Sequence, residues 1–484
     1  MAGGTPAIRM AGKMPAVPEK TSMRYLWLAL FALLIAILAA GPLFFSSGEQ
    51  AEEQLLVISP HWDGIRHEFG RAFAAQYLKT TGKSINVAWV DVGGMGEIVK
   101  YLELRFGSAG PQEGVNLDVL FGGGMDKMPA LAASGFFEPF PLPLELAKKI
   151  PAELNGQPLR DPLNRYLAAC LSCFGFVYNK LVLEKAHLPT PKTWEDLGAP
   201  AFQGWVSCGD PTLSGSLHMA FELVLQGEGW EKGYTTLVRL ISNVRSFNEG
   251  GSSVPRDVSL GQAAVGPCID FYASAPIRRQ GAAHLQLVIP AQTAVATPDP
   301  IAILRHPPNP EAARAFVEFV LSEAGQRLWY EARGEPGGPV DYDLERLPVM
   351  PEIYERGYKT YTVLNPFKQA GVMKYDFKKG GGRWNTLNDL WRATILEVHG
   401  ELNAARQAVL AAGRDGDLGY ALGQAPLSEA AVAKLAAAKL PADERNALRN
   451  RWSAWAREWY AAIARAARTG GPVPEFRAAP SIAD

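Results

Sequence analysis

The chain lacks an excess of charge of either sign. Its 48 lysine and arginine residues nearly balance its 49 aspartate and glutamate residues, and the formal net charge at pH 7 is −1. Binding to the phosphate backbone of a nucleic acid needs a basic surface. This balance therefore argues against nucleic acid as the main partner, and we expect none.

Cysteine is scarce as well, with four residues in a chain of 484. Cys170 and Cys173 form a CxxC pair, but the stretch YLAACLSCFGFVYN has the pattern of a strand, where residues three apart point to opposite faces. No second Cys or His pair has the spacing of a zinc knuckle. We therefore favour structural cysteines over a metal or redox site; the pairing of these two with Cys208 and Cys268 stays open.

The signatures of common enzymes are missing. There is no GxSxG nucleophile elbow and no HExxH zinc motif, and GGMGEIVK lacks the GK[ST] of a phosphate-binding loop. The seven histidines are scattered, with no pair spaced to lie on one helix face. We expect no catalytic residues and no cofactor, and we rank a hydrolase as the least favoured interpretation.

Charge is absent from one long apolar run. Residues 26–45 read LWLALFALLIAILAAGPLFF, which is long enough to cross a bilayer as a helix. Basic residues precede the run and acidic residues follow it, so the positive-inside rule leaves a tail at 1–24 in the cytoplasm. We predict a membrane anchor at 25–46 with the rest of the chain on the periplasmic or extracellular face. A cleaved signal peptide is the open alternative.

What the chain does contain, from residue 54 onward, is an alternation of apolar strand-like and amphipathic helix-like segments. Such alternation indicates an α/β protein with a mostly parallel sheet. The pattern changes near residue 345, after which an irregular stretch leads into long Ala- and Arg-rich helical segments. A chain of this length has room for two to four domains. We therefore expect α/β domains followed by a mostly helical C-terminal extension over 346–484.

Six strand-like segments run into small or polar loops that open helices: SPHWDG, VGGMG, FGGGMD, DPTLSGS, NEGGSSVPRD and DFYAS. In open α/β sheets, ligands bind outside the carboxyl ends of strands, where helix N-termini present free N–H groups. Each loop alone is explained as well by a tight turn or an N-cap. Together the six predict a binding site for a small solute.

The order and spacing of several segments resemble the ferric-ion and phosphonate type of extracellular solute-binding proteins of ABC importers, across about residues 54–350. The segments are LLVISPH, LDVLFGGGMDKMPALAASGFFEPF, CFGFVYNK, LPTPKTWEDL, SGSLHMAFELVLQGEGWEKGY, GSSVPRDVSLGQAAVGPCIDFYA, PDPIAILRHPPNPEAARAFVEFVLSEAGQRLW and GGPV. The resemblance implies a two-lobed periplasmic-binding-protein fold (type II) that closes on its ligand about a hinge. It places one lobe at 54–165 plus 297–345 and the other at 166–296, with crossing segments near RYLAACLS and TAVATPDP. The implied partner is an ABC permease.

The resemblance also implies the binding residues, although each has a structural alternative as a cap or a packing residue. Tyr272 falls where ferric binders tend to carry the second of two adjacent tyrosines, but Phe271 replaces the first. Fe(III) prefers hard oxygen ligands, so Tyr272, His61 and Asp270 make a thin set for iron as a transported ligand. The glycine and serine loops suit a small oxyanion such as a phosphonate or phosphate ester better. The predicted ligand-binding residues are His61, Gly94, Gly123, Gly124, Ser172, Ser214, Gly215, Ser216, Ser252, Ser253, Asp270 and Tyr272, with Tyr272 and His61 as metal ligands only if the solute is ferric ion.

Two functions follow from these expectations. The favoured one is an extracytoplasmic solute-binding protein that delivers a small anion or ferric ion to an ABC permease. The alternative is a membrane-anchored ligand sensor or interaction protein on the same fold, in which the C-terminal extension docks a partner. We expect the extension to pack back against the lobes, partly because its tryptophans have the spacing of core residues.

Overall fold

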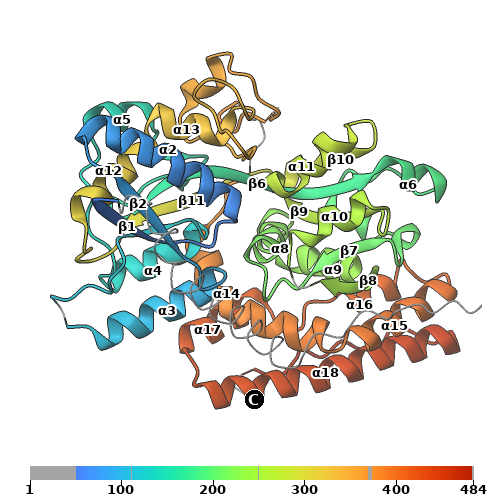
Figure 1. The fold of residues 1–484 in the computed structure, drawn as a ribbon. Coiled ribbons are helices and arrows are strands. Elements are labelled where there is room, and N and C mark those ends of the chain that lie inside the picture. The colour runs from blue at the N-terminus through green and yellow to red at the C-terminus, as the bar shows by residue number, and fades with distance from the viewer. Residues whose placement is uncertain (1–50, 111, 249, 363, 369–372, 482–484) are drawn as a thin grey trace, which may run out of the picture. The chain divides into compact units, whose positions relative to one another are not determined.

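The computed structural model describes residues 51–110, 112–248, 250–362, 364–368 and 373–481 (Figure 1). The predicted tail at 1–24 and the predicted anchor at 25–46 lie outside these residues. Within the described ranges, no helix is long and apolar enough to cross a membrane.

Nine described strands form one sheet with parallel flanks and an antiparallel centre. The order is β2-β1-β3-β11-β6-β9-β7-β8, and β10 pairs with β6 off this path. The pairs β1–β2, β1–β3, β7–β8 and β7–β9 are parallel, whereas β11 and β6 run antiparallel to their neighbours. The expectation of a mostly parallel sheet is therefore correct for the flanks and wrong for the centre.

The first flank is a conventional α/β layer. Its long helix α2 begins after Trp62 and ends at Gly82, which adopts the left-handed conformation that favours glycine (φ 74°), as the sequence predicts. The strands are β1 (Glu53–Ile58), β2 (Ile85–Val90) and β3 (Val119–Phe121), with the short hairpin β4 (Glu153–Leu154) and β5 (Gln157–Pro158). The helices are α2 (Asp63–Thr81), α3 (Met95–Ser108), η1 (Met125–Lys127), α4 (Met128–Ala133), α5 (Leu144–Lys149), α12 (Pro310–Leu321), α13 (Glu323–Tyr330) and η4 (Pro351–Glu355).

The second flank repeats the construction. Thr193 caps α7 in a capping box with Asp196, as the TWEDL pattern predicts. Its strands are β7 (Val206–Gly209), β8 (Val244–Asn248), β9 (Val265–Ile269) and β10 (Leu285–Val288). Its helices are α6 (Lys180–Lys185), α7 (Trp194–Leu197), η2 (Pro200–Phe202), α8 (Gly215–Gly227), α9 (Trp230–Ser242), α10 (Ser253–Ser259), α11 (Asp270–Gln280) and η3 (Ala291–Thr293).

Two strands join the flanks. β6 (Leu167–Asn179) is buried at all 13 residues; its first half pairs with β11 (Ala296–Ile303) and its second half with β9. A third segment follows the same path, because Leu347 forms an isolated bridge to Leu171. The two segments expected to cross between lobes thus correspond to β6 and β11, which are neighbours at the centre of the sheet.

The side chains form two large cores. We call the elements around the core from Leu55 to Ile353 the first lobe, and those around the core from Phe174 to Val295 the second lobe. The lobe boundaries over 54–165, 166–296 and 297–345 stay a prediction. All four cysteines are buried and free, so no disulfide links the cores.

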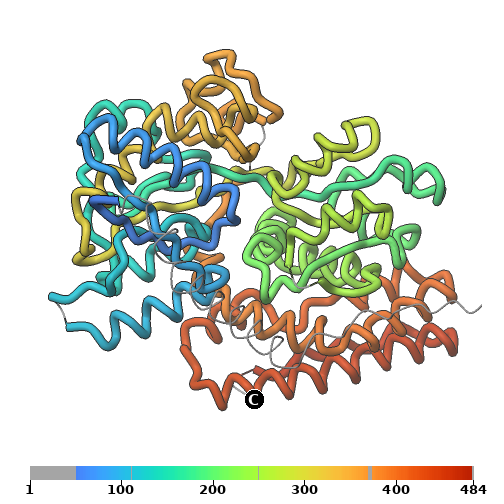
Figure 2. Tube along the Cα trace, in the orientation of Figure 1, coloured from blue at the N-terminus to red at the C-terminus, as the bar shows by residue number. Residues whose placement is uncertain are grey.

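The helices of the C-terminal extension are part of the second core, whereas Leu347, Val349, Met350 and Ile353 belong to the first. Its helices pack beside the elements of the second lobe, as the red and green segments of Figure 2 show, and Leu387, Trp391 and Trp452 belong to the same apolar cluster as Phe221. Irregular chain occupies the described residues of 346–376 apart from η4 (Pro351–Glu355), and helix begins at Phe377, earlier than the glycine-rich sequence suggests. The helices are α14 (Phe377–Trp391), the π-helical turn η5 (Arg392–Leu396), α15 (His399–Ala411), α16 (Leu418–Leu422), α17 (Glu429–Ala438) and α18 (Ala442–Thr469).

Candidate ligand site at the crossing strands

Three predicted loops of the first lobe lie together. Gly122 follows β3 with φ 95°, and a Cβ added there would lie 2.6 Å from the ring of His61. A Cβ on Gly123 would lie 2.4 Å from the sulfur of Met95, next to the exposed Gly94 that caps α3. Only glycine allows the backbone of the Gly122–Gly124 loop to approach the other two loops this closely.

Two serine loops of the second lobe also meet. Ser214 caps α8, and its Oγ lies 3.1 Å from the Oγ of Ser216. A Cβ on Gly251 would lie within 2.7 and 2.9 Å of these two hydroxyl oxygens, so the loop that leads to Ser252 and Ser253 packs on them. Ser253 donates a hydrogen bond to the carbonyl of Gly250, whereas Ser252 and Gly215 are exposed.

Asp270 and Tyr272 lie in the first turn of α11 and not in a loop, which corrects the expectation for DFYAS. Asp270 is buried and accepts hydrogen bonds from the backbone N–H groups of Cys173 and Phe271. Burial raises the pKa of Asp270 to about 6. Its carboxylate links α11 of the second lobe to β6 through backbone hydrogen bonds. This is the structural alternative to ligand contact that the sequence left open for Asp270.

A buried arginine that the sequence did not suggest connects these groups. One Nη of Arg346 donates to the Oγ of Ser172 at 2.9 Å and lies 2.7 Å from a carboxylate oxygen of Asp299. The guanidinium lies over the ring of Phe271, at 4.5 Å, and near Trp329, at 5.6 Å. Arg346 therefore touches both crossing strands and an aromatic side chain of each lobe.

Local chain geometry explains how Asp299 reaches this position. It stands between Pro298 and Pro300 in β11, and the pairing register with β6 shifts between Asp299 and Pro300. Proline cannot donate to a strand ladder and is tolerated at such irregularities. The PDP sequence thus makes a bulge that presents the carboxylate to His61, Arg346 and the N–H of Gly124.

The charges of Asp299 and Arg346 largely compensate each other within this cluster. Burial alone would raise the pKa of Asp299, but the guanidinium of Arg346 and a 3.0 Å hydrogen bond from His61 hold that pKa well below its usual range. Burial lowers the pKa of His61, which keeps its imidazole neutral at pH 7. With Nε2 bonded to Asp299, the Nδ1 of His61 is a free acceptor.

Two polar atoms of the cluster lack partners. The Nε of Arg346 and the Nδ1 of His61 are buried and have no hydrogen-bond partner among the described residues. Buried polar groups are nearly always paired with protein, water or ligand. Within one cluster, a donor on a cationic side chain and an acceptor suit a ligand that carries both an anionic group and a hydroxyl.

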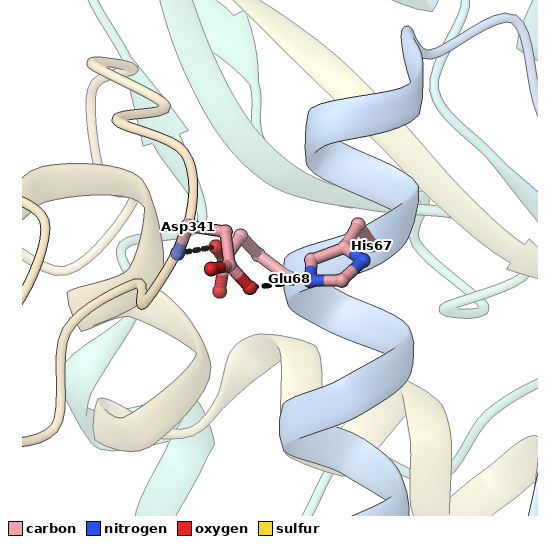
Figure 3. A group of neighbouring side chains, drawn as sticks. All are labelled: His67, Glu68 and Asp341. Carbon is pink, nitrogen blue, oxygen red and sulfur yellow. Dashed lines mark hydrogen bonds and ion pairs between the residues drawn. The ribbon is translucent and has the colours of Figure 1, made fainter.

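A second group of ligating side chains, His67, Glu68 and Asp341, does not suit a metal ion (Figure 3). Both oxygens of the buried Glu68 are occupied, because they accept hydrogen bonds from the backbone N–H groups of 340, 341 and 342 and from Arg71. His67 bonds to Asp341 at 2.7 Å. The group instead ties the segment before Arg346 onto α2.

Residues 118–351 match the family model described as "Bacterial extracellular solute-binding protein". The "Phosphoglycerate transport regulatory protein PgtC" of Salmonella typhimurium is 28% identical over 252 residues, which cover 52% of this chain and 62% of that protein. This chain thus spans less than two thirds of that relative. An "Uncharacterized protein" of Haemophilus influenzae is 27% identical over 349 residues, 72% of this chain and 91% of the relative.

Solved structures share the fold at low identity. The periplasmic binding protein AfuA from Actinobacillus pleuropneumoniae, with fructose-6-phosphate bound, aligns with a TM-score of 0.57 at 20% identity over 71% of this chain and 98% of AfuA. The apo ferric ion-binding protein A of Pasteurella haemolytica aligns at 0.53 with 16% identity, over 70% and 96%. The fold is therefore that of the two-lobed periplasmic binding proteins.

Residues 118–351 are therefore similar to the bacterial extracellular solute-binding proteins. This confirms the resemblance that the segment order indicates. None of the comparisons tests the individual ligand-binding residues, which stay predictions.

Proposed function

We propose that the protein captures a small phosphorylated or phosphonate-like organic anion in the periplasm and delivers it to an ABC permease. The observation that carries this proposal is Arg346, a buried cation with an unpartnered Nε at the junction of both lobes. Arginine suits oxyanion recognition because its planar guanidinium offers several donors in a fixed geometry. The serine hydroxyls of the second lobe would add neutral donors.

Ferric ion fits these residues less well. Fe(III) needs hard, ionised oxygen ligands, and burial raises the pKa of the Tyr272 hydroxyl, which opposes formation of the phenolate. His61 is committed to Asp299, and Asp270 to backbone N–H groups. Support for an anion also comes from the relatives, since one is named for phosphoglycerate transport and one structure holds fructose-6-phosphate.

A sensor role is the second candidate. One relative is named a transport regulatory protein. Gly381 of α14 packs against Asp126 of the first lobe, and Trp384 contacts both Lys127 of the first lobe and His218 of the second. An extension that touches both lobes could report their arrangement to a partner. The anchor predicted at 25–46 would suit either role.

Calorimetry and thermal unfolding of the full chain test the proposed ligand class. The solutes are fructose-6-phosphate, a phosphoglycerate, an aminoethylphosphonate, ferric citrate and unphosphorylated fructose. We expect a phosphorylated or phosphonate compound to stabilise the protein, by about 2.7 kcal/mol at 100 times its Kd, and fructose to have no effect.

Variants sharpen this test. The double change Ser214→Ala and Ser216→Ala removes two hydroxyls and is expected to weaken binding about tenfold, or 1.4 kcal/mol. Ser108→Ala, at an exposed helix end, is the control. Binding of iron alone, lost in Tyr272→Phe, would identify a ferric carrier; no stabilisation by any solute would contradict the proposal.

A further inference from the structure

A cavity of about 640 Å³ lies between the first lobe and the C-terminal extension. α3, η1 and α4 form one wall, and α14, α17 and α18 form the other. None of the predicted ligand-binding residues lines the cavity, although Asp126, the last residue of the predicted loop FGGGMD, does. Its volume is in the usual range for sites that bind small molecules.

The inner surface of the cavity is apolar. Leu131, Leu435, Leu448 and Trp452 line it, and each is less than 8% exposed. These side chains come from three different elements, so the surface is built by packing the extension against the first lobe. An apolar group of a ligand would find a preformed surface here.

Three lysines on the lining, Lys127, Lys378 and Lys439, have no carboxylate within ion-pair distance in the described residues. Lys127 is half-buried, with its ammonium 5.1 Å from the ring of Trp384. Burial lowers the pKa of Lys127 to about 8. Asp126 and the exposed Glu103 offset the charge of Lys127 only in part, because burial reduces the charge of Asp126; an anionic ligand would further stabilise the partly buried ammonium.

Most of the carboxylates on the lining are compensated. Asp389 accepts two hydrogen bonds from Arg445, at 2.9 and 2.7 Å. Asp126 accepts a hydrogen bond from Tyr375, and burial raises the pKa of Asp126 to about 7, which reduces its charge. Glu103 is exposed at the edge. The balance of uncompensated charge around the apolar surface is positive.

We propose that this cavity is a second binding site, which takes a small amphipathic organic anion. Its carboxylate or phosphate group would face the lysines at Lys127, Lys378 and Lys439, and its hydrocarbon portion would lie against Leu448 and Trp452. Neither the family nor the named ligands of the relatives assign this site, and it does not depend on the solute proposed above.

The position of the cavity connects it to the candidate ligand site. Asp126 and Lys127 lie in η1, which follows the Gly122–Gly124 loop, and Trp384 stacks on His218 in α8, the helix that Ser214 caps. α14 therefore contacts both η1, which follows a glycine loop of the first lobe, and α8, which follows a serine loop of the second lobe. An anion that holds Lys127 against α14 would fix one side of this connection.

Calorimetric titration of the full-length protein with octanoate tests the proposal, with octylammonium and octanol as cationic and neutral comparisons. Octanoate avoids confusion with the first site because it carries no phosphate. We expect octanoate alone to bind at one site. The double change Lys378→Glu and Lys439→Glu affects exposed side chains and is expected to weaken octanoate binding by tenfold or more.

The matched control is Lys79→Glu with Lys434→Glu, which makes the same change in net charge at exposed lysines outside the cavity. Quenching of tryptophan fluorescence by a brominated octanoate, reduced in Trp452→Phe, would place the ligand. No binding of octanoate at millimolar concentration, equal binding of octanol, or equal loss in both double variants would overturn the proposal.

Discussion

The two lobes share a construction but differ in how their cores are completed. The core of the first lobe contains only residues between Leu55 and Ile353. The core of the second lobe continues into the extension and includes side chains as far as Ala479. The helices of the extension, from Phe377 onward, are thus a structural part of the second lobe. They meet the first lobe at η1 and α4, around Asp126, Lys127 and Leu131.

Polar contacts show the same difference. In the second lobe, the buried carboxylate of Glu222 is neutralised by Arg383 of α14, with N–O distances down to 2.7 Å. Tyr234 bonds to Thr394, and the indole of Trp230 donates to the carbonyl of Leu427. Without the extension these buried groups would lose their partners, at a cost of about 1–3 kcal/mol for each neutral group. The second lobe therefore depends on the extension to pair these buried groups.

The largest expected effect is that of Trp391→Ala, which should destabilise the second core and leave the first unchanged. Trp391 is 1% exposed and packs edge-on against Phe221. Trp391→Ala should leave a cavity and cost about 3–5 kcal/mol. Hydrogen exchange should show the loss of protection in α8, α9 and α15, while β1 and β3 keep theirs.

The control for this change is Trp62→Ala. Trp62 is 42% exposed on the first lobe, and we expect its loss to cost less than about 1 kcal/mol. An equal fall of protection in β1 and α8 after Trp391→Ala would show that the lobes unfold as one unit and would remove the distinction.

A pH dependence should sharpen the comparison at the junction of α8 with α14. His218 is fully buried, stacks on Trp384 with ring centroids 3.5 Å apart, and bonds to Asn388 at 2.7 Å. Burial lowers the pKa of His218 to about 3. Between that value and the unfolded value near 6.5, the unfolded chain binds the extra proton, so falling pH destabilises the fold.

His218→Gln removes this dependence. From pH 7.5 to pH 5.0 the wild type should lose about 2 kcal/mol more stability than the variant, at 1.36 kcal/mol per unit below 6.5. Asp126 and Asp270, with pKa values raised to about 7 and about 6, act in the opposite direction in both proteins and cancel in the difference. Denaturant unfolding at both pH values measures this difference in the free energy of unfolding. If the wild type and the variant lose the same stability between the two pH values, His218 is protonated in the folded protein at pH 5.0.

Local signals in the sequence predicted much of the fold and part of the site. Gly82 ends α2 because it adopts a left-handed conformation, and Thr193 starts α7 because it caps the helix. Both effects depend only on residues close in the sequence. The glycine and serine loops were placed correctly at the carboxyl ends of strands. The prediction was wrong for Asp270, which lies in the first turn of α11 and not in a loop. The local sequence there is compatible with either a loop or a helix start.

The centre of the site could not be found this way. Arg346 meets Ser172 across 174 positions, and Asp299 meets His61 across 238. The sequence around Arg346 does not distinguish it from the other arginines. For Asp299, only the flanking prolines in the PDP sequence indicate an irregular strand. The irregular stretch expected after residue 345 also contains the start of α14, where Gly380 and Gly381 closely approach Tyr375 and Asp126 in tertiary contacts.

The smallest expected effect compares one ligand loop from each lobe. Gly123 has φ 108°, and a Cβ there would meet Met95 at 2.4 Å; Gly215 begins α8 with no atom within 4 Å of an added Cβ. Gly123→Ala should cost about 1–3 kcal/mol because both the backbone and the contact are strained. Gly215→Ala should be neutral or stabilise by up to about 1 kcal/mol. Thermal unfolding of the two variants measures this difference. Equal stabilities would mean that the first-lobe loop relaxes freely, and that the close packing of the Gly122–Gly124 loop on Met95 and His61 contributes little to the shape of the site.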